Sequence, residues 1–405
     1  MATHHTFRMN HGSKRREFLS RAAALNGAVP VGGRRLAAAD DATGGGGIGV
    51  PLAPPDRQPP KLAVPEAPGR KVGWAVVGLG QLALEEIMPA FAGAHSSELV
   101  AVVSGHAEKA RKVADAYGIK PEAIYDYESY DRLAQNERVE VIYIVLPNSM
   151  HAEFTMRGLK AGKHVLCEKP MAVSVEEGER MIAAAKEAKR MLGIAYRLHY
   201  EPLNRRVMEM CARKEFGKIK TFESSNCQDV QAPDIRLSKT LGGGPVGDVG
   251  IYSINAARTA TGEEPIEVTA MAHHPTDDPR FREVPESVVF TLRFPSGVLA
   301  NCDCSFGTGE SRRYRVHCAD GWIEMDPAFS YRGLRLGTRR GAAKEAENAE
   351  LLIEQVNHFA AEMDHFSDCV LHGKALRTPG EMGLADLRVV AAIYEAARTG
   401  RVVKL

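Results

Sequence analysis

Hydrophobic residues in the first half of the chain occur in short unbroken runs, separated by longer amphipathic stretches. An apolar run without alternation is typical of a strand buried on both faces of a sheet. The runs span residues 72–77, 99–103, 141–145, 165–167 and 193–195, and helical patterns follow over about 82–92, 108–117, 151–161 and 176–190. Strands that alternate with helices at this spacing predict parallel βαβ units and a doubly wound α/β sheet over residues 71–195.

Beyond Tyr196 the pattern changes to short strands separated by turns. The predicted strands span residues 219–223, 266–270, 287–294, 298–304, 314–318 and 321–325. Turns such as Pro295-Ser296-Gly297 favour hairpins, and therefore a large, open, mostly antiparallel sheet. Two helices, predicted over about 348–371 and 381–399, are expected to cover it. Residues 196–405 thus form a second, α+β domain, which we expect to supply substrate and subunit contacts.

The N-terminal 70 residues contain no such pattern. Ser13-Lys14-Arg15-Arg16-Glu17-Phe18-Leu19 is typical of a twin-arginine leader, and a short, mildly apolar run leads to Ala37-Ala38-Ala39, a candidate cleavage site. Residues 1–39 are therefore predicted to be a signal peptide that sends the folded protein to the periplasm. The alternative is a basic tail without a targeting function, which would leave the protein in the cytoplasm. Residues 40–70 are rich in Gly and Pro and predict an extended arm.

Composition narrows the classes of partner. The chain has 405 residues, 44% of them hydrophobic and 25% charged, and its net charge of +1 gives no field that would attract nucleic acid. No stretch reaches the ~18 apolar residues of a membrane span. The odd number of cysteines, seven, predicts buried thiols rather than a disulfide framework. Cys302 and Cys304 lack further ligands nearby, so we expect no metal site.

The first predicted strand ends in a glycine-rich turn, Gly78-Leu79-Gly80-Gln81-Leu82-Ala83, that opens a helix. In this position the first glycine makes the tight turn, the second lets the backbone approach a pyrophosphate, and Ala83 allows close helix packing. The helix N-terminus favours the phosphate charge. We therefore expect Gly78, Leu79, Gly80, Gln81 and Leu82 to bind a dinucleotide, and residues 71–195 to be a Rossmann domain.

The end of the second predicted strand indicates which dinucleotide binds. An NAD enzyme places Asp or Glu there to hold the ribose 2′-hydroxyl, whereas this chain has Ser104, Gly105 and, five residues after Ser104, Lys109. A hydroxyl beside a cation suits a 2′-phosphate, so NADP is favoured over NAD. The alternative is that Ser104 and Gly105 merely make a turn and that Lys109 lies on a solvated helix face.

Four motifs occur together in the remaining sequence. They are Glu168-Lys169-Pro170, Leu146-Pro147-Asn148 with His151, the stretch 196–202 (Tyr-Arg-Leu-His-Tyr-Glu-Pro), and the stretch 242–252, which contains Asp248 and Tyr252. In this combination the chain resembles the glucose-fructose oxidoreductase and inositol dehydrogenase (Gfo/Idh/MocA) family over residues 72–405. Most members carry His where this chain has Tyr252, and Tyr there is similar to the exported glucose-fructose oxidoreductase branch.

The residues themselves suggest the chemistry. Oxidising a sugar at its anomeric carbon requires a base for the hydroxyl proton while hydride leaves for nicotinamide. Tyr252 is the expected base, although a phenol ordinarily has a pKa near ~10, so a nearby ammonium is needed to favour the phenolate. Lys169 is the expected ammonium. Asp248, one helical turn before Tyr252, should bind sugar hydroxyls or hold Lys169.

Further roles are implied only by the resemblance. Glu168 would contact the nicotinamide ribose, and Pro170 would follow a cis peptide bond that aims Lys169. The other residues expected to border the cofactor are Tyr127, Asn148, His151 and Arg197. The family resemblance also implies a homo-oligomer, dimer or tetramer, and an arm that wraps a neighbouring subunit near its cofactor.

Together these features predict an NADP-dependent sugar oxidoreductase. Because nicotinamide nucleotides are made inside the cell, an exported enzyme must carry its cofactor and regenerate it. We therefore expect an aldose to be oxidised to its lactone and the hydride to pass, through tightly bound NADP, to a second, fructose-like sugar that becomes a polyol. One alternative is a simple NAD(P)-dependent sugar dehydrogenase or anhydrosugar reductase that uses free cofactor. A sugar or nucleotide sensor is another, against which the presence of Lys169, Asp248 and Tyr252 argues.

Overall fold

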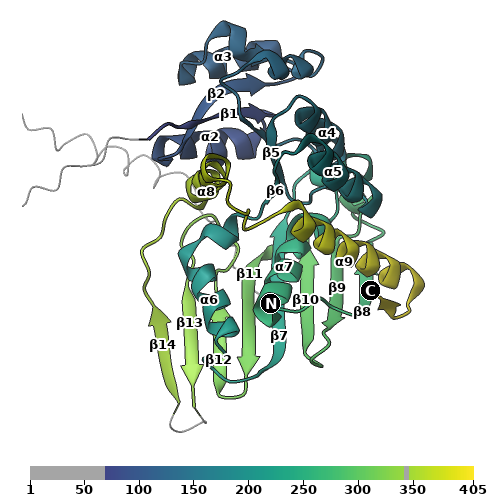
Figure 1. Ribbon diagram of the computed structural model, residues 1–405. Helices are drawn as coiled ribbons and strands as arrows, with labels where there is room; N and C mark the ends of the chain where they lie inside the picture. Colours follow the sequence, from purple (N-terminus) through teal and green to yellow (C-terminus); the bar gives the residue numbers. More distant parts are fainter. Residues whose placement is uncertain (1–68, 342–345) are drawn as a thin grey trace, which may run out of the picture. The chain divides into compact units, whose positions relative to one another are not determined.

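The computed structural model describes residues 69–341 and 346–405, which contain two β-sheets and the helices packed on them (Figure 1). The signal peptide predicted over residues 1–39 lies outside the described residues. So does the predicted arm, apart from Gly69 and Arg70. The structural findings below therefore concern the two predicted domains.

The first sheet is a doubly wound parallel sheet, as predicted. Its six strands are ordered β3-β2-β1-β4-β5-β6, and all neighbours run parallel. The strands are β1 (Val72–Val77), β2 (Ser97–Val103), β3 (Ile124–Tyr125), β4 (Val141–Ile144), β5 (His164–Glu168) and β6 (Leu192–Ala195). Strand order reverses between β1 and β4, the position at which such sheets bind ligands beyond the carboxyl ends of their strands.

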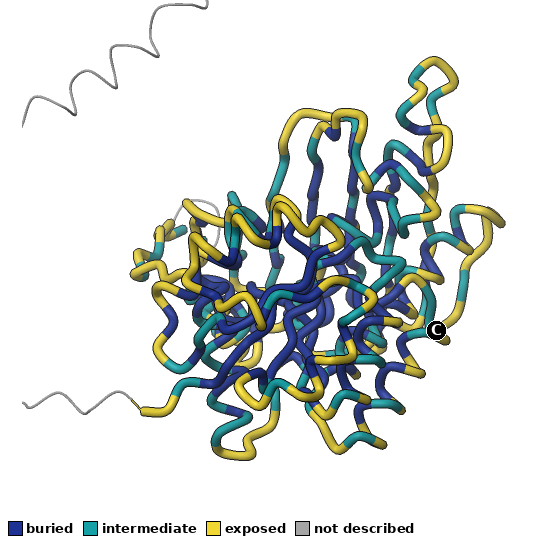
Figure 2. Tube along the Cα trace, turned by 90° about the horizontal axis from the view of Figure 1, so that it is seen from above, coloured by how far each residue is buried: buried dark blue, intermediate teal, exposed yellow. Residues whose placement is uncertain are grey.

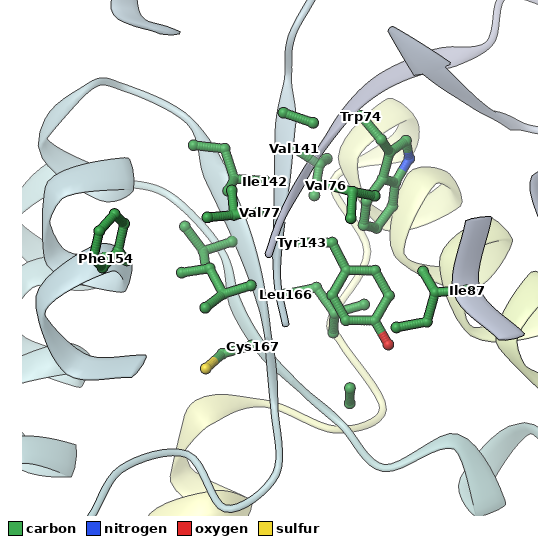
Figure 3. Close-up of a cluster of buried hydrophobic side chains, with 14 of the residues drawn as sticks. Trp74, Val76, Val77, Ile87, Val141, Ile142, Tyr143, Phe154, Leu166 and Cys167 are labelled. Carbon is green, nitrogen blue, oxygen red and sulfur yellow. The ribbon is translucent and has the colours of Figure 1, made fainter. Parts of the chain in front are cut away.

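Helices cover both faces of this sheet. A helical segment after β1 comprises a π-helical stretch (Ala83–Ile87) and α2 (Met88–Ala90), and it is followed by α3 (Ala107–Tyr117), α4 (His151–Lys160) and α5 (Val175–Ala188). Every residue of β1 and β4 is buried, which explains their unbroken apolar sequences. Phe154 of α4 lies on one side of the sheet, and Trp74 and Tyr143 lie on the other (Figure 3).

The helix α8 (His358–His372) belongs to the first sheet, not to the second. Its Phe366 ring lies 5.5 Å from the Trp74 ring, and the Trp74 indole donates a 3.0 Å hydrogen bond to the Ser367 hydroxyl. The prediction that both final helices cover the second domain is therefore wrong for α8. Phe366 and Ser367 of α8 thus complete the burial of Trp74 on that face of the first sheet, together with Phe91 and Tyr143.

The second sheet has nine strands in the order β14-β13-β12-β11-β7-β10-β9-β8-β15. Its neighbours are antiparallel except for the parallel pair β7 and β10, so the prediction of a large, mostly antiparallel sheet is confirmed. The strands are β7 (Ile219–Asp229), β8 (Glu267–His273), β9 (Ser287–Arg293), β10 (Leu299–Ser305), β11 (Gly307–Cys318), β12 (Gly321–Met325), β13 (Leu336–Arg340), β14 (Glu347–Leu351) and β15 (Val403–Lys404).

The predicted helix over residues 348–371 begins too early. Residues 347–351 pair with β13 as the strand β14, and α8 starts only after Asn357, whose side chain accepts hydrogen bonds from the amides of Phe359 and Ala360. A helical sequence preference at 347–351 is overridden by sheet pairing, and the Asn cap fixes the true helix start.

Three helices lie on one face of the second sheet (Figure 1): α6 (Pro202–Ala212), α7 (Ile251–Thr261) and α9 (Gly380–Thr399). The pattern did not predict α6, which begins at Pro202 after Glu201 caps the amides of Leu203 and Asn204. The buried residues lie in the interior of the molecule, and the exposed residues lie mostly in the loops around it (Figure 2). The oligomer implied by the family resemblance stays a prediction.

The seven cysteines are free thiols, six of them buried and Cys318 half-buried, as the sequence predicted. Within residues 69–341 and 346–405, no group of three or more His, Cys, Asp or Glu side chains is arranged to hold a metal ion. No helix in the same residues is long and apolar enough to cross a membrane.

Candidate active site

The motifs found in the sequence converge on one edge of the first sheet. Gly78 follows β1, Ser104 follows β2, Leu146 lies two residues beyond β4, Glu168 ends β5, and Tyr196 follows β6. Parallel strands present their carboxyl ends at the same edge, so residues separated by more than 100 positions in the sequence lie together. The site is a product of the sheet topology.

The glycine turn has the geometry that the sequence predicts. Gly78 adopts a φ of +94°, and a Cβ there would lie 2.2 Å from the carbonyl oxygen of Val145, so only glycine is tolerated. A Cβ at Gly80 would meet no atom within 4 Å among the described residues. Leu79 and Ala83 are buried, whereas Gly80 and Gln81 are exposed at the start of the helical segment. The backbone is thus accessible to a pyrophosphate beside a helix N-terminus, with Leu82 half-buried behind it.

Lys109 reaches this turn from α3. Its ammonium lies 3.3 Å from the carbonyl oxygen of Leu79, although the side chain is otherwise exposed. The Ser104 hydroxyl accepts a 3.2 Å hydrogen bond from the amide of His106. A Cβ at Gly105 would lie 2.9 Å from the Tyr127 ring, so Tyr127 packs over the same turn. Ser104 therefore does shape the turn, and Lys109 and Tyr127 contact the backbone on either side of it.

Lys169 and Asp248 form an ion pair across the two domains. The Lys169 ammonium lies 3.0 Å from Asp248 Oδ1 and donates a 2.8 Å hydrogen bond to the Asp248 carbonyl. The other carboxylate oxygen, Oδ2, accepts a 2.8 Å hydrogen bond from Arg236 Nε. Each oxygen of Asp248 therefore contacts a cation, and Asp248 holds Lys169 in place in this structure.

Electrostatics keeps both partners charged. Burial alone would favour the neutral amine, but the carboxylate of Asp248 raises the pKa of Lys169 above its ordinary value. Burial alone would likewise favour a neutral Asp248, but the Lys169 and Arg236 cations lower the pKa of Asp248. Lys169 is thus a permanent ammonium at neutral pH. The peptide bond between Lys169 and Pro170 is cis, as the resemblance implied.

Tyr252 lies on α7 beside this ion pair. The Lys169 ammonium is 4.8 Å from the centre of its ring, and the Phe329 ring packs at 5.7 Å. Asp248 belongs to a π-helical turn, Val246–Gly250, that precedes α7, so the two side chains are not on one regular α-helical face. They still meet, because both contact Lys169. Within the described chain no hydrogen bond engages the Tyr252 hydroxyl, which leaves it available to a substrate.

Arg197 closes the site from the side of the second domain. Its guanidinium lies 5.4 Å from the Tyr252 ring centre and 4.6 Å from that of Tyr331, and it donates hydrogen bonds to the carbonyls of Phe329 and Ser330. Burial raises the pKa of Tyr331 to about 12. Arg197 is only 3% exposed, and its guanidinium packs between the Tyr252 and Tyr331 rings rather than facing solvent.

Asn148 and His151 link parts of the site. The Asn148 amide donates a 2.9 Å hydrogen bond to the carbonyl of Gly242, in a loop of the second domain. The His151 ring is fully buried, with Nδ1 2.8 Å from the Pro170 carbonyl and Nε2 2.9 Å from the Leu146 carbonyl. Burial lowers the pKa of His151, so the neutral ring donates to one carbonyl. The structure thus places His151 behind Pro170 rather than in an open site.

Glu168 ends β5 and is mostly buried. Its Oε1 accepts a 2.9 Å hydrogen bond from the Tyr143 hydroxyl. Burial raises the pKa of Glu168, while the nearby Lys169 ammonium and the Tyr143 hydroxyl oppose this shift. The side chain is therefore held in one orientation at the sheet edge, adjoining the catalytic candidates.

A small cavity of about 30 Å³ adjoins Tyr252 between η7 (Arg197–Tyr200), α6 and α7. His199 lines this cavity, and its Nε2 atom lies 2.7 Å from Oδ1 of Asn255. This volume suits water rather than a sugar. Tyr200 and Glu201 do not line it: Tyr200 bonds Thr378, and Glu201 caps α6.

Sequence reasoning missed Arg236 and Tyr331. Arg236 lies in the loop between β7 and the π-helical turn, and Tyr331 lies in the loop after β12. Neither residue belongs to a recognised motif. Each lies at the site because of the path of its loop in the folded protein. The one available signal is that Arg236 lies in a long stretch without a predicted element, just before the motif that contains Asp248.

The chain belongs to the Gfo/Idh/MocA family of oxidoreductases. Residues 72–196 match the family described as "Oxidoreductase family, NAD-binding Rossmann fold", and residues 204–324 match the family's C-terminal domain. The resemblance predicted from the four motifs is therefore confirmed, together with the fold class and the assignment as an oxidoreductase.

Relatives with assigned activities cover most of the chain. An NADP-dependent D-xylose 1-dehydrogenase of Haloarcula marismortui is 31% identical over 345 residues, 82% of this chain and 93% of that protein. The crystal structure of an aldose-aldose oxidoreductase from Caulobacter crescentus, complexed with glycerol, is 43% identical with a TM-score of 0.80, over 83% of this chain and 100% of that one. A 3-ketoreductase from Actinomadura kijaniata, in complex with NADP and TDP-benzene, is 26% identical with a TM-score of 0.72, over 81% and 98% of the two chains.

Proposed function

We propose that this protein is an NADP-dependent sugar oxidoreductase that oxidises an aldose at C1 and reduces a second sugar in the same site, without releasing its nucleotide. The observation that carries the proposal is the grouping of Asp248 and Tyr252 around Lys169, which follows β5 at the same edge of the first sheet as the glycine turn after β1. The similarity to an aldose-aldose oxidoreductase supports the use of two sugars. The xylose dehydrogenase and 3-ketoreductase relatives support NADP.

The described residues suit NADP in particular. No carboxylate follows β2, where NAD enzymes hold the ribose 2′-hydroxyl, and Lys109 provides a cation beside the open backbone of Gly80. When bound, NADP would supply the hydride chemistry, as acceptor towards the first sugar and as donor towards the second. Ser104, Tyr127 and Lys109 would surround the 2′-phosphate end, and Glu168 the nicotinamide ribose.

The protein's own groups handle the proton. The Tyr252 oxygen is the base that takes the C1 hydroxyl proton of an aldose as hydride leaves C1, and a lactone forms. The Lys169 ammonium donates a hydrogen bond to the reacting oxygen, on which negative charge develops as the proton leaves. In the second half of the cycle Tyr252 returns the proton to the carbonyl oxygen of the second sugar as its carbon gains hydride, giving an alcohol. Proton and hydride are both balanced over the cycle.

The test is turnover without added nucleotide. Purified protein, passed through gel filtration, should release NADP rather than NAD on denaturation. Incubated with pairs of sugars, it should form lactone and polyol in equal amounts. With only one sugar of such a pair, the concentration of product should not exceed the concentration of enzyme. Protein carrying Lys169→Ala serves as the inactive control. A preparation that is free of nucleotide and turns over only with stoichiometric added NADP would refute the two-sugar cycle.

The same experiment separates the second candidate, a sugar dehydrogenase that uses free NADP. The xylose dehydrogenase relatives, 31% and 32% identical, favour it. A dehydrogenase would produce NADPH continuously from one sugar when NADP is in excess, with no need of an acceptor sugar. The two-sugar enzyme would instead stop after one turnover per site under those conditions.

We further propose that the protein works in the periplasm after twin-arginine export. The supporting feature is the sequence Arg15-Arg16-Glu17-Phe18-Leu19 before a short apolar run. Residues 1–55 fused to a reporter should direct it to the periplasm, and replacing both Arg15 and Arg16 with Lys should abolish this. A fusion that stays in the cytoplasm, or is exported without the arginine pair, would contradict the proposal and favour the free-cofactor dehydrogenase.

A further inference from the structure

A buried carboxyl group that the proposed chemistry does not use lies behind Glu168. Glu362, on α8, is 1% exposed. Its Oε1 is the one carboxylate oxygen among the buried polar side-chain atoms of the described chain that lack a hydrogen-bond partner. Its Oε2 lies 3.5 Å from the Tyr143 hydroxyl. Among the described residues Glu362 forms no ion pair, so a negative charge there would have no direct partner.

Hydrogen-bond accounting decides where the proton lies. The Tyr143 hydroxyl has one proton to donate, and it lies closer to Glu168, at 2.9 Å, than to Glu362, at 3.5 Å. If Tyr143 donates to Glu168, an ionised Glu362 would have no donor at either oxygen. A protonated Glu362 can instead donate from Oε2 to the free lone pair of Tyr143, and the unpartnered Oε1 is then an uncharged carbonyl oxygen.

The charges around Glu362 agree with this arrangement. The groups that face it are Tyr143 on β4, Glu168 on β5, and Arg197 and Tyr200 on η7, with His358 one helical turn earlier on α8. Burial raises the pKa of Glu362 well above its ordinary value, and the neighbouring Glu168 raises it further. Arg197 opposes this shift: its Nη1 and Nη2 donate to the carbonyls of Ser330 and Phe329, while its buried Nε has no hydrogen-bond partner among the described residues, and no ion pair joins it to Glu362.

We propose that Glu362 is a positioning residue that stays protonated at neutral pH and, by donating to Tyr143, holds the Glu168 carboxylate in the orientation that meets the cofactor. The chain of hydrogen bonds runs from Glu362 through Tyr143 to Glu168. A neutral Glu362 also keeps a second negative charge away from Glu168 at the reacting end of the site. The link to the cofactor rests on the proposed function, but the location of the proton does not.

The first test measures thermal stability against pH without added ligand. A group that is protonated when folded and ionised when unfolded makes the folded state less stable as pH rises above about 4.5, up to the pKa of the folded state. Glu362→Gln removes this loss. The variant should therefore match wild type in Tm within about 1 °C at pH 5 and exceed it by about 2 °C or more at pH 8. Glu354→Gln, the same change at an exposed position, should follow wild type throughout. If Glu362→Gln follows wild type throughout, or falls below it as pH rises, Glu362 is ionised and the proposal is wrong.

The second test measures the dissociation constant for added NADP on nucleotide-free protein. Glu362→Gln keeps a donor for Tyr143 and should stay within about twofold of wild type. Tyr143→Phe and Glu362→Leu each break this chain of hydrogen bonds. Each should weaken NADP binding about tenfold, because the Glu168 carboxylate is then no longer held in its orientation by a hydrogen bond. The double variant should be no weaker than either single variant, because both act through the same chain. Additive losses, or normal binding by Tyr143→Phe, would overturn the positioning role. If wild-type protein binds no NADP, the proposed function fails while the pH comparison still locates the proton.

Discussion

Replacing Lys169 with alanine is expected to lower kcat about 1000-fold or more while NADP remains bound. Lys169 is the ammonium that contacts both the Tyr252 ring, at 4.8 Å, and Asp248, at 3.0 Å. Its removal takes away the positive charge beside Tyr252 and the donor for the reacting oxygen. The glycine turn and Lys109, which define the other end of the cofactor site, are unchanged.

The variant should also fold, which makes the result interpretable. Breaking a buried ion pair normally leaves an uncompensated charge. Here Asp248 keeps its 2.8 Å hydrogen bond from Arg236, so its carboxylate stays paired. Lys160→Ala, at an exposed position on α4, is the matched control and should keep wild-type activity and Tm. Activity of Lys169→Ala within tenfold of wild type, with a normal Tm, would remove Lys169 from the chemistry.

Part of this site could be predicted because its residues stand next to strands. Gly78 and Glu168 each border a buried apolar run, and parallel topology carries such positions to one edge. The role of Asp248 was left open between binding a sugar and holding Lys169, because it depends on Arg236. That residue arrives from a loop whose path follows from tertiary packing, such as the hydrogen bond from Asn148 to the Gly242 carbonyl.

The same limit explains what was missed around α8. Residues 359, 363 and 366 form the apolar stripe of a helix, and Glu362 interrupts that stripe at a buried position. The stripe predicts burial but does not say against which sheet, because the Rossmann layer that receives it lies more than 200 residues earlier. A charged residue on a predicted buried stripe was the signal that could have identified Glu362 from sequence.

Replacing Tyr252 with phenylalanine is the second change expected to have a large effect, a loss of about 100- to 10,000-fold in kcat. The ring and its contacts with Lys169 and Phe329 remain, and only the hydroxyl that exchanges the proton is lost. Within the described residues no hydrogen bond engages that hydroxyl, so its removal leaves no partner unsatisfied. Tm and retained NADP should therefore equal those of wild type within about 1 °C and about twofold.

Tyr331→Phe is the control that makes the assignment specific. Tyr331 faces the same guanidinium of Arg197, at 4.6 Å, but burial raises its pKa to about 12, so its hydroxyl is a poor source of phenolate at neutral pH. The phenylalanine keeps the stacking on Arg197, and kcat should stay within about threefold of wild type. Single-turnover reduction of bound NADP by an aldose, followed by absorbance, measures the step directly. A large loss in Tyr331→Phe with normal rates in Tyr252→Phe would exchange the two roles, and it would place the base in the loop after β12 rather than on α7.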